Sequence, residues 1–249
     1  MALTAKKHFP AKQVRDFSHF TPKKEPSVVF YDWGNALISF SAFGTSFLLA
    51  NYGMELHQAN LFLFSYTIGF GILGLSAGIK ISSRLKKRKS FTFVISQFLS
   101  TLLSSISIPL LYSSFALVLP VPALLYSLVT VIMFFCGVSL SMMAQLLPSD
   151  PSHAQKLNYV WGALIASGLS LPLLHFTEVS FFRVGSFLAL PSAIFTMGIS
   201  WAHRRGFKSH QNQWLIAIGA VTTLLIFHFL FADKFKSYLE FKFFQIKPL

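Results

Sequence analysis

The chain has few of the residues on which most enzymes depend. Only 8 of its 249 residues are Asp or Glu, and none lies in the middle of a long apolar stretch. Cys136 is the single cysteine, which excludes an intrachain disulfide and argues against a thiolate metal cluster. The sequence also lacks a His-Glu-x-x-His motif, a phosphate loop and a nucleophile elbow. We therefore expect no enzyme, no catalytic residue, no metal and no cofactor.

Apolar residues are abundant instead. They make up 53% of the chain, with 29 Phe, whereas charged residues make up only 12%. Because about 20 helical residues cross a hydrocarbon core of about 30 Å, stretches of this length predict membrane-spanning helices. We expect an all-α, polytopic transmembrane bundle with spans at about 34–53, 60–80, 91–113, 122–146, 158–176, 181–202 and 213–232. Ser113-Ser114 and Pro120 are the only breaks expected within 91–146.

The net charge of +13 is unevenly distributed along the chain. Lys and Arg gather before the first span, between the second and third spans, and between the sixth and seventh. These are alternate loops, so the positive-inside rule places the N-terminus in the cytoplasm. The pattern favours contact with a lipid bilayer and argues against nucleic acid as a partner. We expect an integral, multi-pass protein of a bacterial inner membrane or an equivalent membrane.

Four regions follow from this pattern. Residues 1–33 form a basic cytoplasmic segment without the features of a signal peptide, so the first span is expected to direct insertion. Residues 34–202 form a six-helix transmembrane bundle, and 203–232 hold a cytoplasmic loop and the seventh span. Residues 233–249 form an amphipathic, basic tail suited to the membrane interface. Whether the seventh span crosses fully, and on which side the tail lies, stays open.

Three segments carry a family resemblance. They are Tyr31-Asp32-Trp33-Gly34-Asn35-Ala36, the stretch from Gly74 to Lys89, and Gln145 to Asp150 with the following Tyr159-Val160-Trp161-Gly162-Ala163 and Gly168. Together they resemble the N-terminal half of the major facilitator superfamily, most closely the branch of the vacuolar amino-acid effluxers. The resemblance covers about 31–202 and implies six helices that form one half of a transporter.

The first segment has a structural and a functional interpretation. Tyr31 and Trp33 suit an aromatic belt at the membrane surface. Asp32 suits the cap and positive dipole end of the first helix. The resemblance implies instead that Asp32 and the neighbouring Asn35 belong to a gating or substrate-proximal network.

The second segment combines small residues with a basic turn. Gly74 and Gly78 form a small-xxx-small step that allows close helix packing. The basic residues of this cytoplasmic loop are Arg84, Lys86, Lys87, Arg88 and Lys89. The family has an Asp before these basic residues, whereas this sequence reads Gly78-Ile79-Lys80-Ile81-Ser82-Ser83-Arg84. A topology signal is therefore favoured over a family-type cytoplasmic latch.

The third segment contains prolines that end one helix and small residues in the next helix. Pro148 and Pro151 stop a helix, while Gly162 and Gly168 allow close packing of the fifth helix. Gln145 and Trp161 complete the substrate or gating candidates. Farther along the chain, His228 lies on an apolar run, where a neutral, hydrogen-bonded histidine is favoured over a proton relay.

Two hypotheses about function result. The first is a half-transporter, pairing with itself or with a second membrane subunit, that moves a small polar solute such as an amino acid or metabolite. The second is a non-transporting accessory or scaffold subunit that retains the six-helix fold, as the missing second half and the absence of a mid-membrane acid suggest.

Overall fold

The computed structural model describes residues 28–56, 61–85, 89–116, 121–146, 181–202 and 212–244. All regular structure in these ranges is α-helical, which confirms the predicted fold class. The helices are α1 (Val28–Leu56), α2 (Leu61–Ser82), α3 (Lys89–Ala116), α4 (Val121–Leu146), α6 (Phe181–Ala202), α7 (Asn212–Leu230) and α8 (Ala232–Phe244). The predicted fifth span, 158–176, lies outside the described residues.

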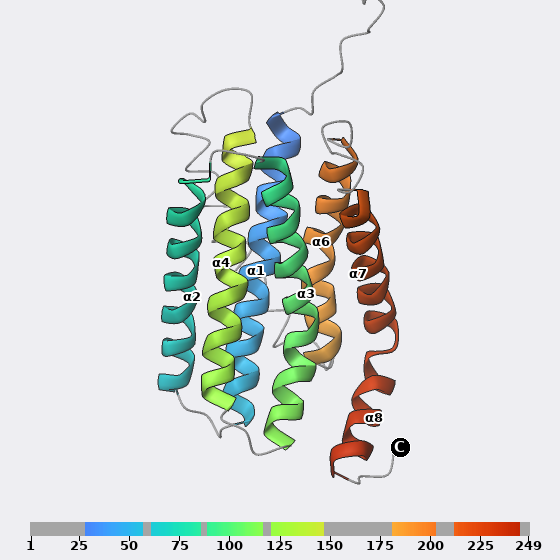
Figure 1. The fold of residues 1–249 in the computed structure, drawn as a ribbon. Helices are drawn as coiled ribbons and strands as arrows, with labels where there is room; N and C mark the ends of the chain where they lie inside the picture. Colours follow the sequence, from blue (N-terminus) through green and yellow to red (C-terminus); the bar gives the residue numbers. More distant parts are fainter. Residues whose placement is uncertain are drawn as a thin grey trace, which may run out of the picture.

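The long helices lie side by side as a bundle (Figure 1), and α1 through α4 alternate in direction. Ring contacts identify one end of this bundle, because Tyr52 of α1 lies 5.0 Å from Phe181 of α6 and Tyr112 of α3 lies 5.8 Å from Phe182. Leu146 ends α4 at the other end of the bundle. Helix α4 therefore ends at one end of the bundle, and α6 begins at the other.

Four helices in the described ranges are long and apolar enough to span a membrane, and the bent pair α7–α8 counts as a fifth if it is one span. The 29-residue helix α1 is long enough but is not one of these four. Its polar residues include Asn35, Ser39, Ser41, Thr45 and Ser46, all of which are buried. A helix surrounded by other helices meets little lipid, so it can carry hydroxyls that a peripheral helix could not. These helices make the chain a multi-pass membrane protein.

Glycines bring α2 and α4 into backbone contact. A Cβ atom placed on Gly74 would lie 2.2 Å from the carbonyl oxygen of Thr130, and one on Gly78 would lie 2.1 Å from that of Phe134. From the opposite side, a Cβ on Gly137 would lie 2.3 Å from the carbonyl oxygen of Leu75. No side chain fits at these positions unless the helices separate. Gly74 and Gly78, the small-xxx-small step of the sequence, both lie at this contact.

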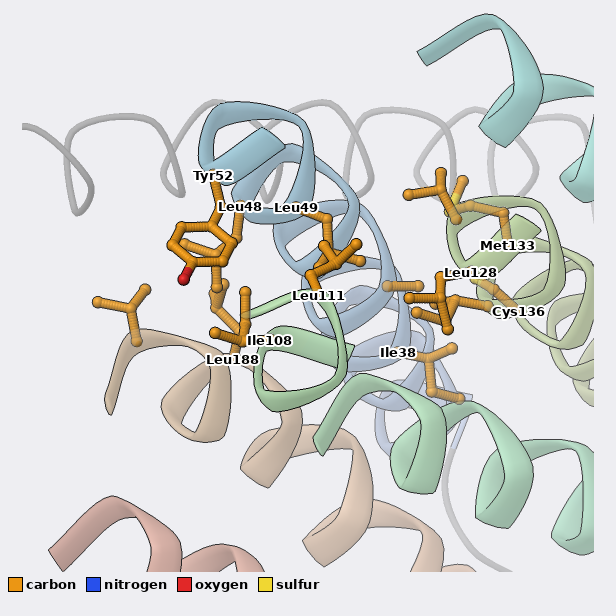
Figure 2. Close-up of a cluster of buried hydrophobic side chains, with 14 of the residues drawn as sticks. Ile38, Leu48, Leu49, Tyr52, Ile108, Leu111, Leu128, Met133, Cys136 and Leu188 are labelled. Carbon is orange, nitrogen blue, oxygen red and sulfur yellow. The ribbon is translucent and has the colours of Figure 1, made fainter. Parts of the chain in front are cut away.

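The apolar core is built around α1 (Figure 2). Leu48 and Leu49 of α1 are fully buried and lie beside Leu111 of α3. Farther along α1, Ile38 faces the part of α4 that carries the buried Cys136. These side chains belong to one continuous cluster that joins α1, α3, α4 and α6. The central helix therefore organises the bundle.

Several helix ends differ from the predicted ones, among them the end of α3 and the start of α1. Helix α3 continues through Ser113-Ser114 to Ala116, because these hydroxyls donate to the carbonyl oxygens of Pro109 and Leu110 one turn back, at 2.8 Å each. Helix α1 begins at Val28, so the backbone of Asp32 lies inside the helix. The prediction that Asp32 caps the first helix is wrong, because the helix starts one turn earlier.

A sharp bend separates α7 from α8, whose axes meet at 79°. Arg183 near the start of α6 forms an ion pair with Asp233 at the start of α8. One turn before the bend, His228 shares a hydrogen bond with Ser186 of α6. The hydrogen bond predicted for His228 is thus confirmed. Both interactions tie the bend to α6 and place α8 at the end of the bundle that holds the Tyr52–Phe181 contact (Figure 1).

Candidate functional site

Buried hydroxyl and amide side chains lie where α1, α3 and α6 contact one another. On α3, the residues of this kind recur every three or four positions, so they lie along one side of the helix. They meet buried polar residues of α1 and α6 in the interior of the bundle. We name as the polar core the buried residues Asn35, Ser39, Ser41, Thr45, Ser46, Ser96, Gln97, Ser100, Thr101, Ser104, Ser107, Ser192 and Thr196.

Ser192 links three helices of the polar core. Its backbone N–H donates to the Ser41 hydroxyl of α1 at 3.3 Å, and its own hydroxyl lies 3.3 Å from that of Thr101 on α3. Ser192 directly follows Pro191, which interrupts the helical hydrogen bonds of α6. The Ser41 hydroxyl accepts from the backbone next to this proline and so joins α1 to α6 at this point.

A further interhelical hydrogen bond joins α3 to α4. The hydroxyls of Ser96 and Ser139 lie 2.8 Å apart, and both residues are buried. Ser139 also donates to the carbonyl oxygen of Phe135 on its own helix, at 2.8 Å. The polar core is therefore joined to α4 by a hydrogen bond between Ser96 and Ser139.

Three atoms of the polar core have no hydrogen-bond partner among the described residues. They are the side-chain oxygens of Asn35 and Thr45 on α1 and the amide nitrogen of Gln97 on α3. All three residues are at most 3% exposed. A buried polar atom without a partner is costly, especially in a membrane. Such atoms are available to bind water, a solute or a group that moves into place.

One small pocket borders the polar core, between α3, α6 and α7. Its empty volume is about 170 Å³, part of which is open to the surroundings, and its lining residues are Gln97, Phe98, Thr101, Ala193, Thr196, Ile218 and Val221. Small-molecule sites are typically about 300–1,000 Å³. The pocket is too small to hold a solute by itself.

The predicted site residues fall into three groups. Asn35 lies in the polar core, near the end of the bundle where Gln145 is half-buried in the last turn of α4. Arg84 is exposed in the turn after α2, and Lys89 begins α3 at the same end. Outside the described residues lie Lys86, Lys87, Arg88, Trp161, Gly162 and Gly168, and the Asp32 side chain is likewise not described.

Gly34 was not a predicted site residue, although it lies inside the first segment of the resemblance. A Cβ atom placed on Gly34 would lie 1.6 Å from the Phe195 ring of α6. The ring therefore covers α1 directly beside Asn35, and an alanine at position 34 would have to displace it. The Gly-Asn pair in the sequence was the available signal, but the partner ring, that of Phe195, lies 161 positions farther along the chain.

The sequence does not reveal the polar core as a network, although Asn35 and Gln97 are amides inside the predicted spans 34–53 and 91–113. The available signal was the density of Ser and Thr between Phe91 and Ser114. Hydroxyls of this kind commonly bond to their own helix, as Ser46 does with the carbonyl oxygen of Ala42 at 2.8 Å. Their number alone therefore does not indicate an interhelical network.

No family model matches the chain, and neither a curated protein nor a solved structure matches it.

Proposed function

We propose that this protein is one half of a membrane transporter of the major-facilitator type. It pairs with a second copy or with another membrane subunit and moves a small polar solute, such as an amino acid or a metabolite, between the two halves. The N-terminus and the basic turn after α2 face the cytoplasm in this proposal, as the charge distribution predicts.

The observation that carries the proposal is the pattern of contacts among four helices. Helix α1 contacts α4 and α6, and α3 contacts the same two helices. This set of contacts is unchanged when α1 is exchanged with α4 and α3 with α6. The exchanged helices run in opposite directions (Figure 1), as in an inverted repeat of three helices each. The contact between α1 and α3 departs from this pattern, because α4 and α6 have no comparably extensive contact.

Two properties of the polar core add support. Asn35, Thr45 and Gln97 each have a buried polar atom without a hydrogen-bond partner among the described residues. Such atoms cost free energy inside a membrane, which favours a functional role for them. The adjoining pocket is too small for a solute. This small size agrees with a solute pathway that forms against a second unit, which is how transporters of this type operate.

Two measurements together test the proposal. Native mass spectrometry after removal of lipid measures the mass of the complex, and uptake of a mixture of labelled amino acids and metabolites into proteoliposomes measures transport. We expect a dimer, or a heteromer with a second membrane subunit, together with accumulation of at least one solute. A monomer that moves no solute would reject the half-transporter.

Asp32→Asn tests the segment of the family resemblance. This substitution removes a charge inside α1 without affecting a helix cap, because α1 begins at Val28. We expect the rate of uptake to fall about tenfold or more while the yield and melting temperature of the protein stay unchanged, a loss of about 1.4 kcal/mol in transition-state stabilisation. Asn35→Ala, at the neighbouring buried position, should also lower uptake. Unchanged uptake in both variants would remove this segment from the transport pathway.

The second candidate function is an accessory or scaffold subunit without transport activity. The small size of the pocket beside the polar core favours it. In that case the complex would contain a different protein, and the transport activity of the assembly would survive Asp32→Asn and Asn35→Ala. The same variants therefore separate the two functions.

A further inference from the structure

Helix α8 is held against the bundle by one of its sides. Ala232 and Leu239 are buried, and the Phe235 ring lies 5.2 Å from His228 and 6.1 Å from Phe182. The ion pair between Arg183 and Asp233 fixes the first turn of the helix to α6. Because α8 is bent by 79° from α7, it can lie along the membrane surface when α7 crosses the membrane.

The opposite side of α8 is exposed and combines lysines with aromatic rings. Lys234, Tyr238, Phe241 and Lys242 are spaced i, i+4, i+7 and i+8, so they share one face of the helix. Tyr238 is 55% exposed and Phe241 is 53% exposed. The Lys242 ammonium lies 5.9 Å from the Tyr238 ring, and Lys234 lies 5.8 Å from Phe231. We name as the basic aromatic face these four residues of α8 together with Phe231, which directly precedes the helix.

The charge of this face is positive because both carboxylates of α8 are engaged elsewhere. Asp233 pairs with Arg183, and Glu240 lies 3.7 Å from Lys236. Lys234 and Lys242 have no ion-pair partner among the described residues. Exposed aromatic rings settle at the level of lipid headgroups, and lysine ammonium groups there attract the phosphates of anionic lipids.

We propose that the basic aromatic face binds anionic phospholipid headgroups, with Lys234 and Lys242 as the phosphate-binding groups. The rings of Tyr238 and Phe241 enter the boundary between headgroups and acyl chains and hold the two ammonium groups at phosphate depth. The same contact fixes the bend between α7 and α8. This inference does not depend on transport activity.

The test uses the full chain in nanodiscs of phosphatidylcholine with one third phosphatidylglycerol. Native mass spectrometry measures how strongly phosphatidylglycerol is retained over phosphatidylcholine. Each surface lysine contributes roughly fivefold to the binding of an anionic lipid surface, so the double variant K234Q/K242Q should lower this preference about 25-fold. The charge-conserving variant K234R/K242R should stay within about twofold of the wild type, because phosphate attraction needs the charge.

A second charge removal, K80Q/K89Q, controls for general electrostatics. Lys80 and Lys89 flank the basic turn at the other end of the bundle. The proposal requires a clearly smaller loss of preference in this control than in K234Q/K242Q. Equal losses, or no loss in K234Q/K242Q, would overturn it. It would also fail if lipid composition had no effect while an acidic protein copurified from native membranes in a manner that depends on Lys234 and Lys242.

Discussion

Two contacts in this bundle join helices in different ways. Between α2 and α4, glycines let the backbones touch, and a Cβ on Gly78 would lie 2.1 Å from the carbonyl oxygen of Phe134. Among α1, α3 and α6, hydroxyls join the helices, with Ser192 bonded to Ser41 and Thr101 at 3.3 Å each. The first contact holds helices by their shape, whereas the second holds them by hydrogen bonds.

The difference follows from where each helix lies. Helix α2 carries exposed apolar side chains such as Phe62, Tyr66 and Leu73, which suit a lipid-facing position. Lipid tails are as apolar as leucine, so helix association at such a site depends on close van der Waals packing. Helix α1 is surrounded by α2, α3, α4 and α6, and its Ser41 hydroxyl accepts a hydrogen bond from α6 there. Hydrogen bonds between membrane helices contribute little each, typically about 0.6 kcal/mol. We therefore expect the glycine contact to tolerate substitution far less than the hydroxyl contacts.

The largest effect is expected from Gly78→Leu. The new side chain would overlap the backbone of α4 and force the helices apart, which should lower the free energy of unfolding by about 3 kcal/mol or more. Unfolding in mixed micelles, titrated with sodium dodecyl sulfate and followed by circular dichroism, measures this change.

Gly69→Leu is the matched control, because a Cβ at Gly69 would meet nothing within 4 Å. It lies on the same helix and changes the same residue type, but its surface is open. We expect its free energy of unfolding to stay within about 0.5 kcal/mol of the wild type. If both variants were equally unstable, helix propensity rather than the α2–α4 contact would explain the loss.

A smaller effect is expected from Ser41→Ala. The substitution leaves the Ser192 N–H, next to Pro191, without its acceptor on α1, which should cost about 1 kcal/mol in the free energy of unfolding. Ser46→Ala is the control, because the Ser46 hydroxyl bonds within its own helix. The sodium dodecyl sulfate titration compares the two, and a Ser41→Ala variant no less stable than Ser46→Ala would contradict the expected role of Ser41.

The smallest effect is expected for the Ser96–Ser139 pair. A double-mutant cycle with Ser96→Ala and Ser139→Ala should give a coupling energy of about 0.6 kcal/mol, typical of hydroxyls between membrane helices. The same cycle with Ser96→Ala and Ser46→Ala should give a coupling near zero, since no hydrogen bond joins these two residues. Equal coupling in the two cycles would mean that the 2.8 Å contact makes no specific contribution.

Much of the fold could be predicted because membrane helices can be recognised in a sequence by their length and apolar composition. The predicted spans 60–80 and 181–202 agree closely with α2 and α6, whose bounds are Leu61–Ser82 and Phe181–Ala202. The start of α1 was predicted too late, because Val28 to Trp33 mixes apolar, aromatic and charged residues and gives a weak hydropathy signal. Of the candidate site, Asn35 and the glycines of α2 could be predicted from residue type alone.

The sequence by itself determined that this protein lies in a membrane, where most of its helices are, and that Gly74 and Gly78 lie one turn apart on α2. These are local properties, since burial in lipid acts on each stretch of about 20 residues separately. Only the tertiary structure decided that Gly74 and Gly78 meet α4, that Phe195 covers Gly34, and that Ser41 accepts a hydrogen bond from Ser192. Each of these contacts joins residues more than 50 positions apart, with geometry set by how whole helices pack.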